Sequence, residues 1–204
     1  MDGFDYIDFI VPGIILMQVI TSSYSNVVSS FFGAKFQHSI EEILVSPTPN
    51  YIILLGYIMG GVTRGIIVGL IVTVVSLLFS DLRIYNAGIL ISMVMLTAVL
   101  FSLGGFTNAM FAKTFDDVSI VPTFVLTPLT YLGGIFYSIH LLPSFWQGVS
   151  LGNPILYMIN AFRFGFLGIS DISLWISYLI VSFFIIGLFM INLYFLRRGH
   201  GIRN

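Results

Sequence analysis

Residues 51–79 read YIILLGYIMGGVTRGIIVGLIVTVVSLLF, an apolar run with a single charge at Arg64. A helix needs about 20 predominantly apolar residues to cross a bilayer, so this run is long enough to span one. The whole chain of 204 residues has the same character, because 57% of it is hydrophobic and 8% is charged, whereas a soluble domain is about 25% charged. The sequence therefore predicts an all-α polytopic membrane protein, with one transmembrane domain over residues 1–204.

Apolar runs of similar length recur on both sides of this segment. We expect five spans, at residues 9–32, 51–79, 87–112, 118–139 and 174–196. Lys and Arg are retained on the cytoplasmic side of a membrane, and one side of this arrangement holds most of them: Lys35, Lys113, Arg197, Arg198 and Arg203, against Arg83 and Arg163 on the other. The C-terminus and residues 35–50 are thus predicted to be cytoplasmic. Met1 then lies outside with no basic residue before the first span, so we expect a further segment to precede it.

Residues 35–50, KFQHSIEEILVSPTPN, are a polar interruption between two apolar runs. Ser39 and Glu42 have the spacing of a capping box, and Ile40, Ile43 and Leu44 then share one face of a short amphipathic helix. This helix should end before Pro47, because the residue preceding a proline avoids the helical region. Two interpretations remain open: Glu41 and Glu42 are recognised by a cytoplasmic partner, or the segment is an ordinary connector with a solvated face.

Residues 138–173 form an external stretch that is too apolar for an ordinary loop, although neither of its apolar parts is long enough to span. We expect two short re-entrant or interfacial helices here. The second has a clear start, with Asn153 as N-cap and Pro154 in the first helical position. Tyr157 and Arg163 follow on its polar side. It is predicted either to lie at the outer membrane boundary or to act as a plug that seals the end of the bundle.

Polar residues also recur within the first predicted span, at helical spacing: Gln18, Ser22, Ser25, Asn26 and Ser29. Such a row is typical of the lining of a passage. Hydroxyl and amide groups also join helices to one another, with about 0.6 kcal/mol per hydrogen bond on average. Both uses are compatible with the pattern.

Arg64 is the only charge in the second predicted span, where a cation costs about 2.5–3.5 kcal/mol on insertion scales. We expect it to face the bundle interior or water, or to bond a polar group of a neighbouring helix. Gly61, Gly65 and Gly69 repeat at intervals of four residues in the same span. This pattern predicts close helix packing, within the chain or between two copies of it.

The sequence lacks the residues that several kinds of chemistry require. The sequence has no G-x-x-x-x-G-K-[ST] loop for nucleotide phosphates and no H-E-x-x-H pair for zinc. No Ser, His and acid set falls in one membrane plane, and the net charge of -1 excludes a basic face for nucleic acid. We therefore expect no enzyme activity, no metal, no bound cofactor and no nucleic-acid partner.

Three motifs, read with the stretches around them, indicate a family: E-E-x-L-x-S-P at residues 41–47, T-P-L-x-Y-L-G-G at 127–134 and N-P-x-x-Y at 153–157. In these motifs and in their order, nearly the whole chain resembles the permease subunits of bacterial ABC-2 type exporters. It is similar in particular to the small inner-membrane permeases of nodulation, polysaccharide and drug export. That family has six spans, preceded by an interfacial helix, so this chain is expected to lack the interfacial helix and the first span.

The resemblance implies an inner-membrane exporter that works as a dimer of permeases, with a separate cytoplasmic ATPase that binds ATP and Mg²⁺. Residues 35–50 would be the coupling segment, in which Ser39, Glu41, Glu42, Ile43, Leu44 and Pro47 meet the ATPase. Lys113, Asp116 and Asp117 would form a second contact, and residues 143–168 an external gate that includes Asn153, Pro154, Tyr157 and Arg163. Gln18, Ser22, Asn26, Ser29 and Arg64 are candidates for the pathway. The alternative is an autonomous channel or secondary carrier without an ATPase.

Overall fold

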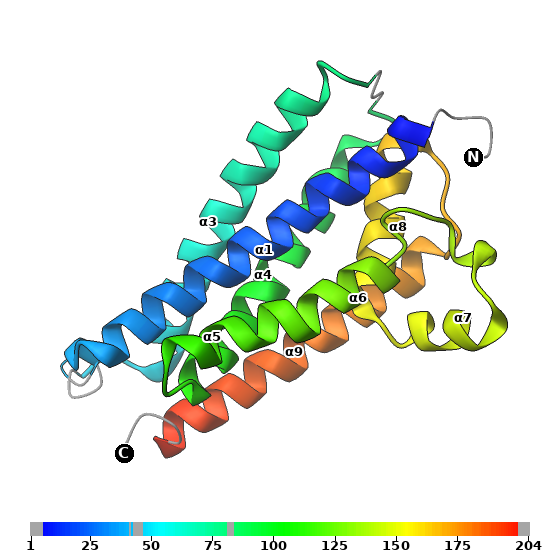
Figure 1. The fold of residues 1–204 in the computed structure, drawn as a ribbon. Coiled ribbons are helices and arrows are strands. Elements are labelled where there is room, and N and C mark those ends of the chain that lie inside the picture. The colour runs from blue at the N-terminus through cyan, green and yellow to red at the C-terminus, as the bar shows by residue number, and fades with distance from the viewer. Residues whose placement is uncertain (1–5, 41, 43–46, 81–83, 200–204) are drawn as a thin grey trace.

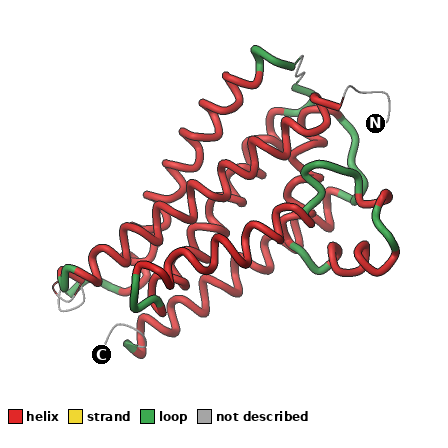
Figure 2. The backbone as a smooth tube through the Cα atoms, in the orientation of Figure 1, coloured by secondary structure: helices red, strands yellow, loops and turns green. Residues whose placement is uncertain are grey.

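The computed structural model describes residues 6–40, 42, 47–80 and 84–199, whose regular structure is helical (Figures 1 and 2). The long helices of the bundle are α1 (Tyr6–Phe36), α3 (Asn50–Ser76), α4 (Ala87–Phe111) and α9 (Leu174–Arg198). The shorter elements are α5 (Phe115–Val121), a π-helical turn (Pro122–Leu126), α6 (Thr127–Leu132), a 3₁₀ turn (Ile139–Leu141), α7 (Ser144–Leu151) and α8 (Pro154–Leu167). The predicted all-α polytopic class is confirmed, because the four long helices have the length and hydropathy of membrane spans.

The fourth predicted span, 118–139, has the wrong boundaries. The chain is helical from Phe115, passes through the π-helical turn, and ends its helix at Leu132. Pro128 has no N–H to donate to the carbonyl four residues earlier, and π-helical turns are one way in which a helix absorbs such an irregularity. The Thr127 hydroxyl donates to the Pro122 carbonyl at 3.0 Å within this turn. Gly134, with φ of 76°, then directs the chain away from the helix.

The glycine ridge of α3 packs within the chain. A Cβ atom built on Gly65 would collide with the Ser23 hydroxyl of α1, and one on Gly69 would lie 2.7 Å from Val19 Cγ2. Gly61 similarly faces Val27, at 2.6 Å from Cγ2. The absence of side chains at these three positions lets the backbones of α1 and α3 approach closely. Of the two uses predicted for the ridge, the structure supports packing inside one chain.

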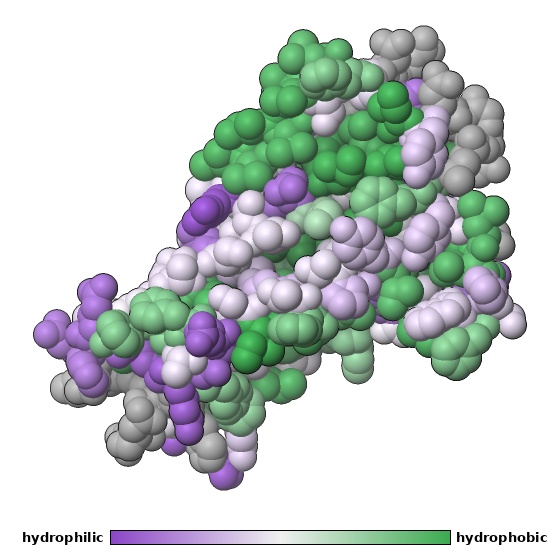
Figure 3. All heavy atoms as spheres, viewed as in Figure 1, coloured by the Kyte–Doolittle hydropathy of each residue, from purple (hydrophilic) through white to green (hydrophobic). Residues whose placement is uncertain are grey.

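Basic residues gather at one end of the bundle. Lys35 lies in the last turn of α1, and its ammonium group contacts the end of α4. Arg197 and Arg198 lie in the last turn of α9, where the ring of Phe195 is 5.0 Å from that of Phe111 at the end of α4. Figure 3 shows the hydrophilic surface of this end, where the C-terminus lies in Figure 1. We call it the Lys35 end; the predicted grouping of Lys35, Arg197 and Arg198 on one side is confirmed.

Helix α8 is packed inside the chain, which favours the second of its two interpretations, the plug. Nearly all its side chains are buried, on its polar and apolar sides alike, because it packs against α4, α9 and α1. Arg163 is only 2% exposed. The geometry is that of a plug inside the end of the bundle opposite Lys35, which we call the Asn153 end. Helix α7 projects outside the bundle at this end (Figure 1).

Candidate transport site

The coupling segment begins where α1 ends. His38 has a positive φ of 59°, and its N–H donates to the Lys35 carbonyl at 3.1 Å, so the chain leaves the helix axis here. The Ser39 hydroxyl donates to the Ala34 carbonyl at 3.1 Å. Ile40 is 2% exposed and anchors the segment in the core. Glu42 and Pro47 are exposed, whereas Glu41, Ile43 and Leu44 lie outside the described residues.

The second predicted contact, around Lys113, is a charged turn with its own internal cap. The backbone N–H groups of Lys113 and Thr114 donate to Asp117 Oδ2 at 2.9 and 3.0 Å. These two bonds hold the pKa of the Asp117 carboxyl below its usual value. The Thr114 hydroxyl in turn accepts the Asp117 N–H at 3.2 Å, which completes a capping box. Lys113 and Asp116 remain exposed at this end, while Asp117 serves the start of α5.

The sequence interpretation missed this capping box. Thr114 and Asp117 have the [ST]-x-x-[DE] spacing that signals one, directly before an apolar run. That signal identifies Asp117 as a structural residue as well as a candidate for ATPase contact.

The polar row of α1 lies on the outer side of the bundle. Gln18, Ser22 and Asn26 are half-buried and Ser29 is exposed. Asn26 faces α3, because a Cβ atom built on Gly60 would lie 3.4 Å from Asn26 Oδ1. Figure 3 shows a hydrophilic group between α3 and α1, away from both ends. The polar side chains of this row can therefore contact whatever lies against this face of the chain.

Arg64 lies one helical turn beyond Gly60, near the middle of α3, and its side chain is exposed. Of the alternatives predicted for Arg64, the structure excludes a position in the interior of this chain's own bundle. The glycine ridge of α3 already occupies the inner face of the helix and packs against α1. Arg64 and Asn26 therefore both lie along the outer seam between α1 and α3.

The residues predicted for the external gate join α8 to its neighbours. Asn153 Oδ1 accepts the Ile155 N–H at 3.0 Å, and its Nδ2 donates to the Leu129 carbonyl of α6 at 2.6 Å. The Tyr157 hydroxyl donates to the Leu151 carbonyl of α7 at 2.7 Å. Pro154 occupies the first position of α8, as predicted.

Arg163 extends this set of bonds to α1. Its guanidinium donates to the Gly134 carbonyl at 2.7 Å and lies over the Phe9 ring, at 3.7 Å from the centroid. Cation–π contacts of this kind strengthen when they are desolvated. The plug is thus fastened to α6, to α7, to the turn after α6 and to the beginning of α1.

We predict that Asn153→Ala lowers thermal stability more than Asn86→Ala does. Both residues cap a helix, and the loss of a cap costs about 1 kcal/mol. Asn153→Ala also leaves the Leu129 carbonyl without its donor, which costs about 1–3 kcal/mol more for a buried group. Melting curves in detergent micelles measure both variants. Asn153→Asp keeps the capping oxygen and should show only the loss of the bond to the Leu129 carbonyl. Equal melting temperatures for Asn153→Ala and Asn86→Ala would contradict the proposed importance of that bond.

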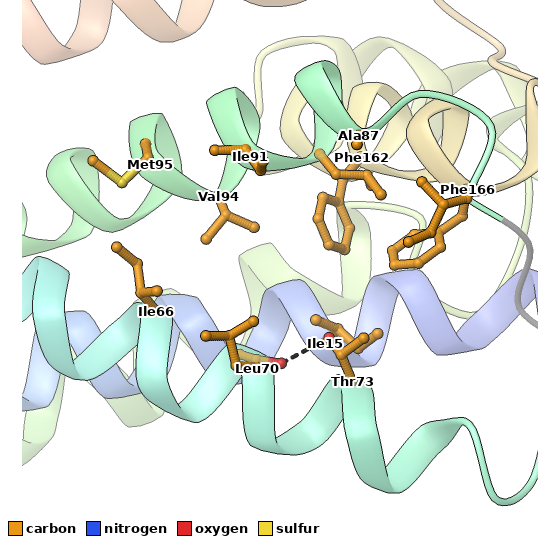
Figure 4. Close-up of a pocket in the computed structure, with 13 residues that line it drawn as sticks. Ile15, Ile66, Leu70, Thr73, Ala87, Ile91, Val94, Met95, Phe162 and Phe166 are labelled. Carbon is orange, nitrogen blue, oxygen red and sulfur yellow. Dashed lines mark hydrogen bonds between the residues drawn. The ribbon is translucent and has the colours of Figure 1, made fainter.

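A separate cavity of about 280 Å³ lies between α3 and α4 (Figure 4). Its lining includes Ile15 of α1 and Phe162 of α8 as well as apolar side chains of both flanking helices. The Thr73 hydroxyl is already bonded to the Gly69 carbonyl at 2.7 Å. Because none of the residues predicted for the pathway lines it, this cavity offers an apolar space that is distinct from the polar seam.

Comparisons with known proteins show the family of this chain. Residues 2–167 match the family described as ABC-2 type transporter. The chain is 55% identical over 204 residues to the inner membrane transport permease YadH of Escherichia coli (strain K12), a match that covers 100% of this chain and 80% of that protein. It is 23% identical over 164 residues to nodulation protein J of Rhizobium meliloti (strain 1021), covering 80% of this chain and 63% of the relative.

Two of the three motifs that carried the resemblance fall on described parts of the fold, whereas E-E-x-L-x-S-P lies mostly outside the described residues. T-P-L-x-Y-L-G-G forms α6 and the turn after it, and N-P-x-x-Y begins the buried plug α8. Four helices of spanning length, and a match of this whole chain to 80% of a transport permease, agree on the same class of protein. The chain belongs to the ABC-2 type transporter family, as a multi-pass inner-membrane permease subunit of an ABC transporter.

Proposed function

We propose that this permease subunit acts as a homodimer in an ATP-driven exporter, with the α1–α3 seam facing the substrate path. The observation that carries this proposal is the exposed position of Arg64 near the middle of α3. A guanidinium at this depth is costly in contact with hydrocarbon and is normally found facing a protein or a water-filled space. The seam therefore suits a path that a second copy encloses.

The polar row supports the same path. Gln18, Ser22, Asn26 and Ser29 follow one side of α1 toward the Lys35 end, and none of them is fully buried in the chain. A single chain would leave amides and hydroxyls in contact with lipid over this length, where unsatisfied polar groups are costly. Two copies with their seams facing one another would give these groups water, partners or substrate instead.

The ATPase is placed at the Lys35 end. Glu42 and Pro47 of the coupling segment, and Lys113 and Asp116 of the charged turn, are exposed there. We assign Ser39, Glu41, Ile43 and Leu44 to the same contact, which matches the docking segment of the family. The concentration of Lys and Arg at this end supports assigning it to the cytoplasmic side. ATP and Mg²⁺ are bound by the ATPase, so the permease itself carries out no chemical step.

The cycle then has two gates that move in turn. ATP-driven closure of the ATPase dimer would displace the coupling segments and open the seam, while release of the α8 plug would open the Asn153 end. A ligand can shift such an equilibrium only through a difference in its affinity for the two states. The bonds from Asn153, Tyr157 and Arg163 hold the closed position of the plug.

We predict that water-soluble thiol reagents reach the seam in the assembled transporter. The chain has no cysteine, so Ser22→Cys and Asn26→Cys each provide a single reactive thiol. Ile71→Cys, on the exposed apolar surface of α3, is the matched control that faces lipid. In membranes that contain the complete ATPase complex, a charged maleimide should label positions 22 and 26 and leave position 71 unlabelled.

The same experiment separates the alternatives. If positions 22 and 26 react no faster than position 71, the seam is not a water-filled path and the proposed route is wrong. If they react equally in membranes without any ATPase, and no ATP-hydrolysing protein co-purifies, the result favours an autonomous channel or carrier.

A further inference from the structure

Lys35 connects the two segments that we assign to ATPase docking. It lies in the last turn of α1, immediately before the coupling segment. Its ammonium group donates to the carbonyl oxygens of Met110 and Ala112, at 2.9 Å in each case. These carbonyls belong to the last turn and the C-cap of α4. The charged turn begins at the next residue, Lys113.

The bonds are of the kind that hold a helix end firmly. The last carbonyls of a helix have no partner within the helix, and the negative end of its dipole attracts a cation. Met110 and Ala112 are both buried, so water is a poor substitute for the ammonium group. Hydrogen bonds that involve a charged group are about twice as strong as neutral ones.

Aromatic contacts reinforce the same junction. The Phe115 ring, at the first position of α5, lies 5.0 Å from that of Phe32 and 5.2 Å from that of Phe36. Phe32 and Phe36 lie on either side of Lys35 in the last two turns of α1. The end of α1 is therefore fixed to both sides of the α4–α5 corner.

The charged turn is internally rigid as well. Its capping box ties Lys113 and Thr114 to Asp117, so a displacement of Ala112 is transmitted to the start of α5. On the other side, Ser39 is bonded back to Ala34 and His38 to Lys35. A force on either segment reaches the other through Lys35.

We propose that Lys35 is a positioning residue that makes the coupling segment and the charged turn move as one body when the ATPase binds ATP. This inference rests on the proposed function, because it assumes that both segments meet the ATPase. It differs from a role in stability alone, since an ordinary helix cap would not set the relative motion of two surface segments.

Spin labels on Gln37→Cys and Ser119→Cys test this proposal directly. Both positions are exposed, one at the start of the coupling segment and one on α5, and the chain has no other cysteine. The labelled permease is diluted with unlabelled permease and assembled with its ATPase in nanodiscs. Dipolar EPR then gives the distance between the two labels with and without a non-hydrolysable ATP analogue.

In the native background we expect one narrow distance distribution that the ATP analogue leaves unchanged. Lys35→Met should lose the narrow distribution and shift when the analogue binds, and Lys35→Arg should restore it, because a guanidinium can still donate to both carbonyls. Arg197→Met removes an exposed charge from the same end and should behave as the native protein. A narrow, unshifted distribution in Lys35→Met would overturn the proposal.

A fallback variant and a binding measurement ensure that the experiment can refute the proposal. If Lys35→Met does not fold, Lys35→Gln is measured instead, because its shorter, uncharged side chain cannot bond both carbonyls, and the same broadening or its absence decides the question. ATPase binding to the native permease is measured in parallel. Failure of that binding would refute the docking assignment itself, whereas normal binding with an unchanged Lys35→Met distribution would refute only the role of Lys35.

Discussion

Reversal of Glu41 and Glu42 to lysine abolishes ATPase docking in the mechanism proposed here, while the permease still inserts and folds. Glu42 is exposed at the Lys35 end, so its side chain is accessible to a partner. Breaking a close charge pair at an interface costs about 2–5 kcal/mol, which corresponds to a rise in Kd of more than about tenfold. Charge reversal adds repulsion to this loss.

The measurement is the affinity of the purified ATPase for the permease in nanodiscs, together with the rate of ATP hydrolysis by the complex. The double variant with glutamine at both positions should fall between the native protein and the lysine variant. His200→Lys and Asn204→Lys add positive charge shortly after Arg197 and Arg198 in the sequence, and serve as the control. Their docking affinity should stay close to the native value.

An unchanged Kd and unchanged ATP hydrolysis in the lysine variant would contradict the coupling assignment. A native permease that moves solute with no ATPase present would instead support an autonomous carrier. The two results are distinct, because the first concerns the place of docking and the second concerns the source of energy.

The class of fold was predictable because hydropathy and length are local properties. Four of the predicted spans agree closely with α1, α3, α4 and α9, and the start of α8 at Asn153 and Pro154 was also correct. Each of these features depends on a run of neighbouring residues or on a cap. Predicting that basic residues gather on one side likewise required only a count of Lys and Arg along the chain.

Features that depend on packing between helices were harder to predict from the sequence. The polar spacing of Tyr157 and Arg163 suggested a helix at a boundary, yet both side chains find carbonyl partners inside the fold, at Leu151 and Gly134. The sequence left open whether Arg64 faces the bundle interior, water or a neighbouring helix, because it does not show that the glycine ridge turns inward. The role of Lys35 was invisible in sequence, because its acceptors lie 75 and 77 residues away.

Gly105→Ala is expected to destabilise the bundle strongly, whereas Gly104→Ala is not. A Cβ atom on Gly105 would lie 2.6 Å from the Tyr24 carbonyl oxygen and 3.2 Å from Val28 Cγ2. The first of these is a backbone atom of α1, so α1 and α4 must separate to admit a methyl group. Overpacking of this kind costs about 1–3 kcal/mol, and the loss spreads along the most extensive helix contact of the fold.

Gly104 is the matched control, because nothing lies within 4 Å of a Cβ atom built there. Alanine should be neutral or slightly favourable at this position, since glycine in a helix interior costs about 0.5–1 kcal/mol relative to alanine. Melting temperatures in detergent micelles should fall for Gly105→Ala and stay level or rise for Gly104→Ala. Equal changes in the two variants would mean that α1 and α4 are not held at this separation. The α1–α3 seam would then have no fixed geometry either, because Gly105 of α4 and the glycine ridge of α3 both pack against α1.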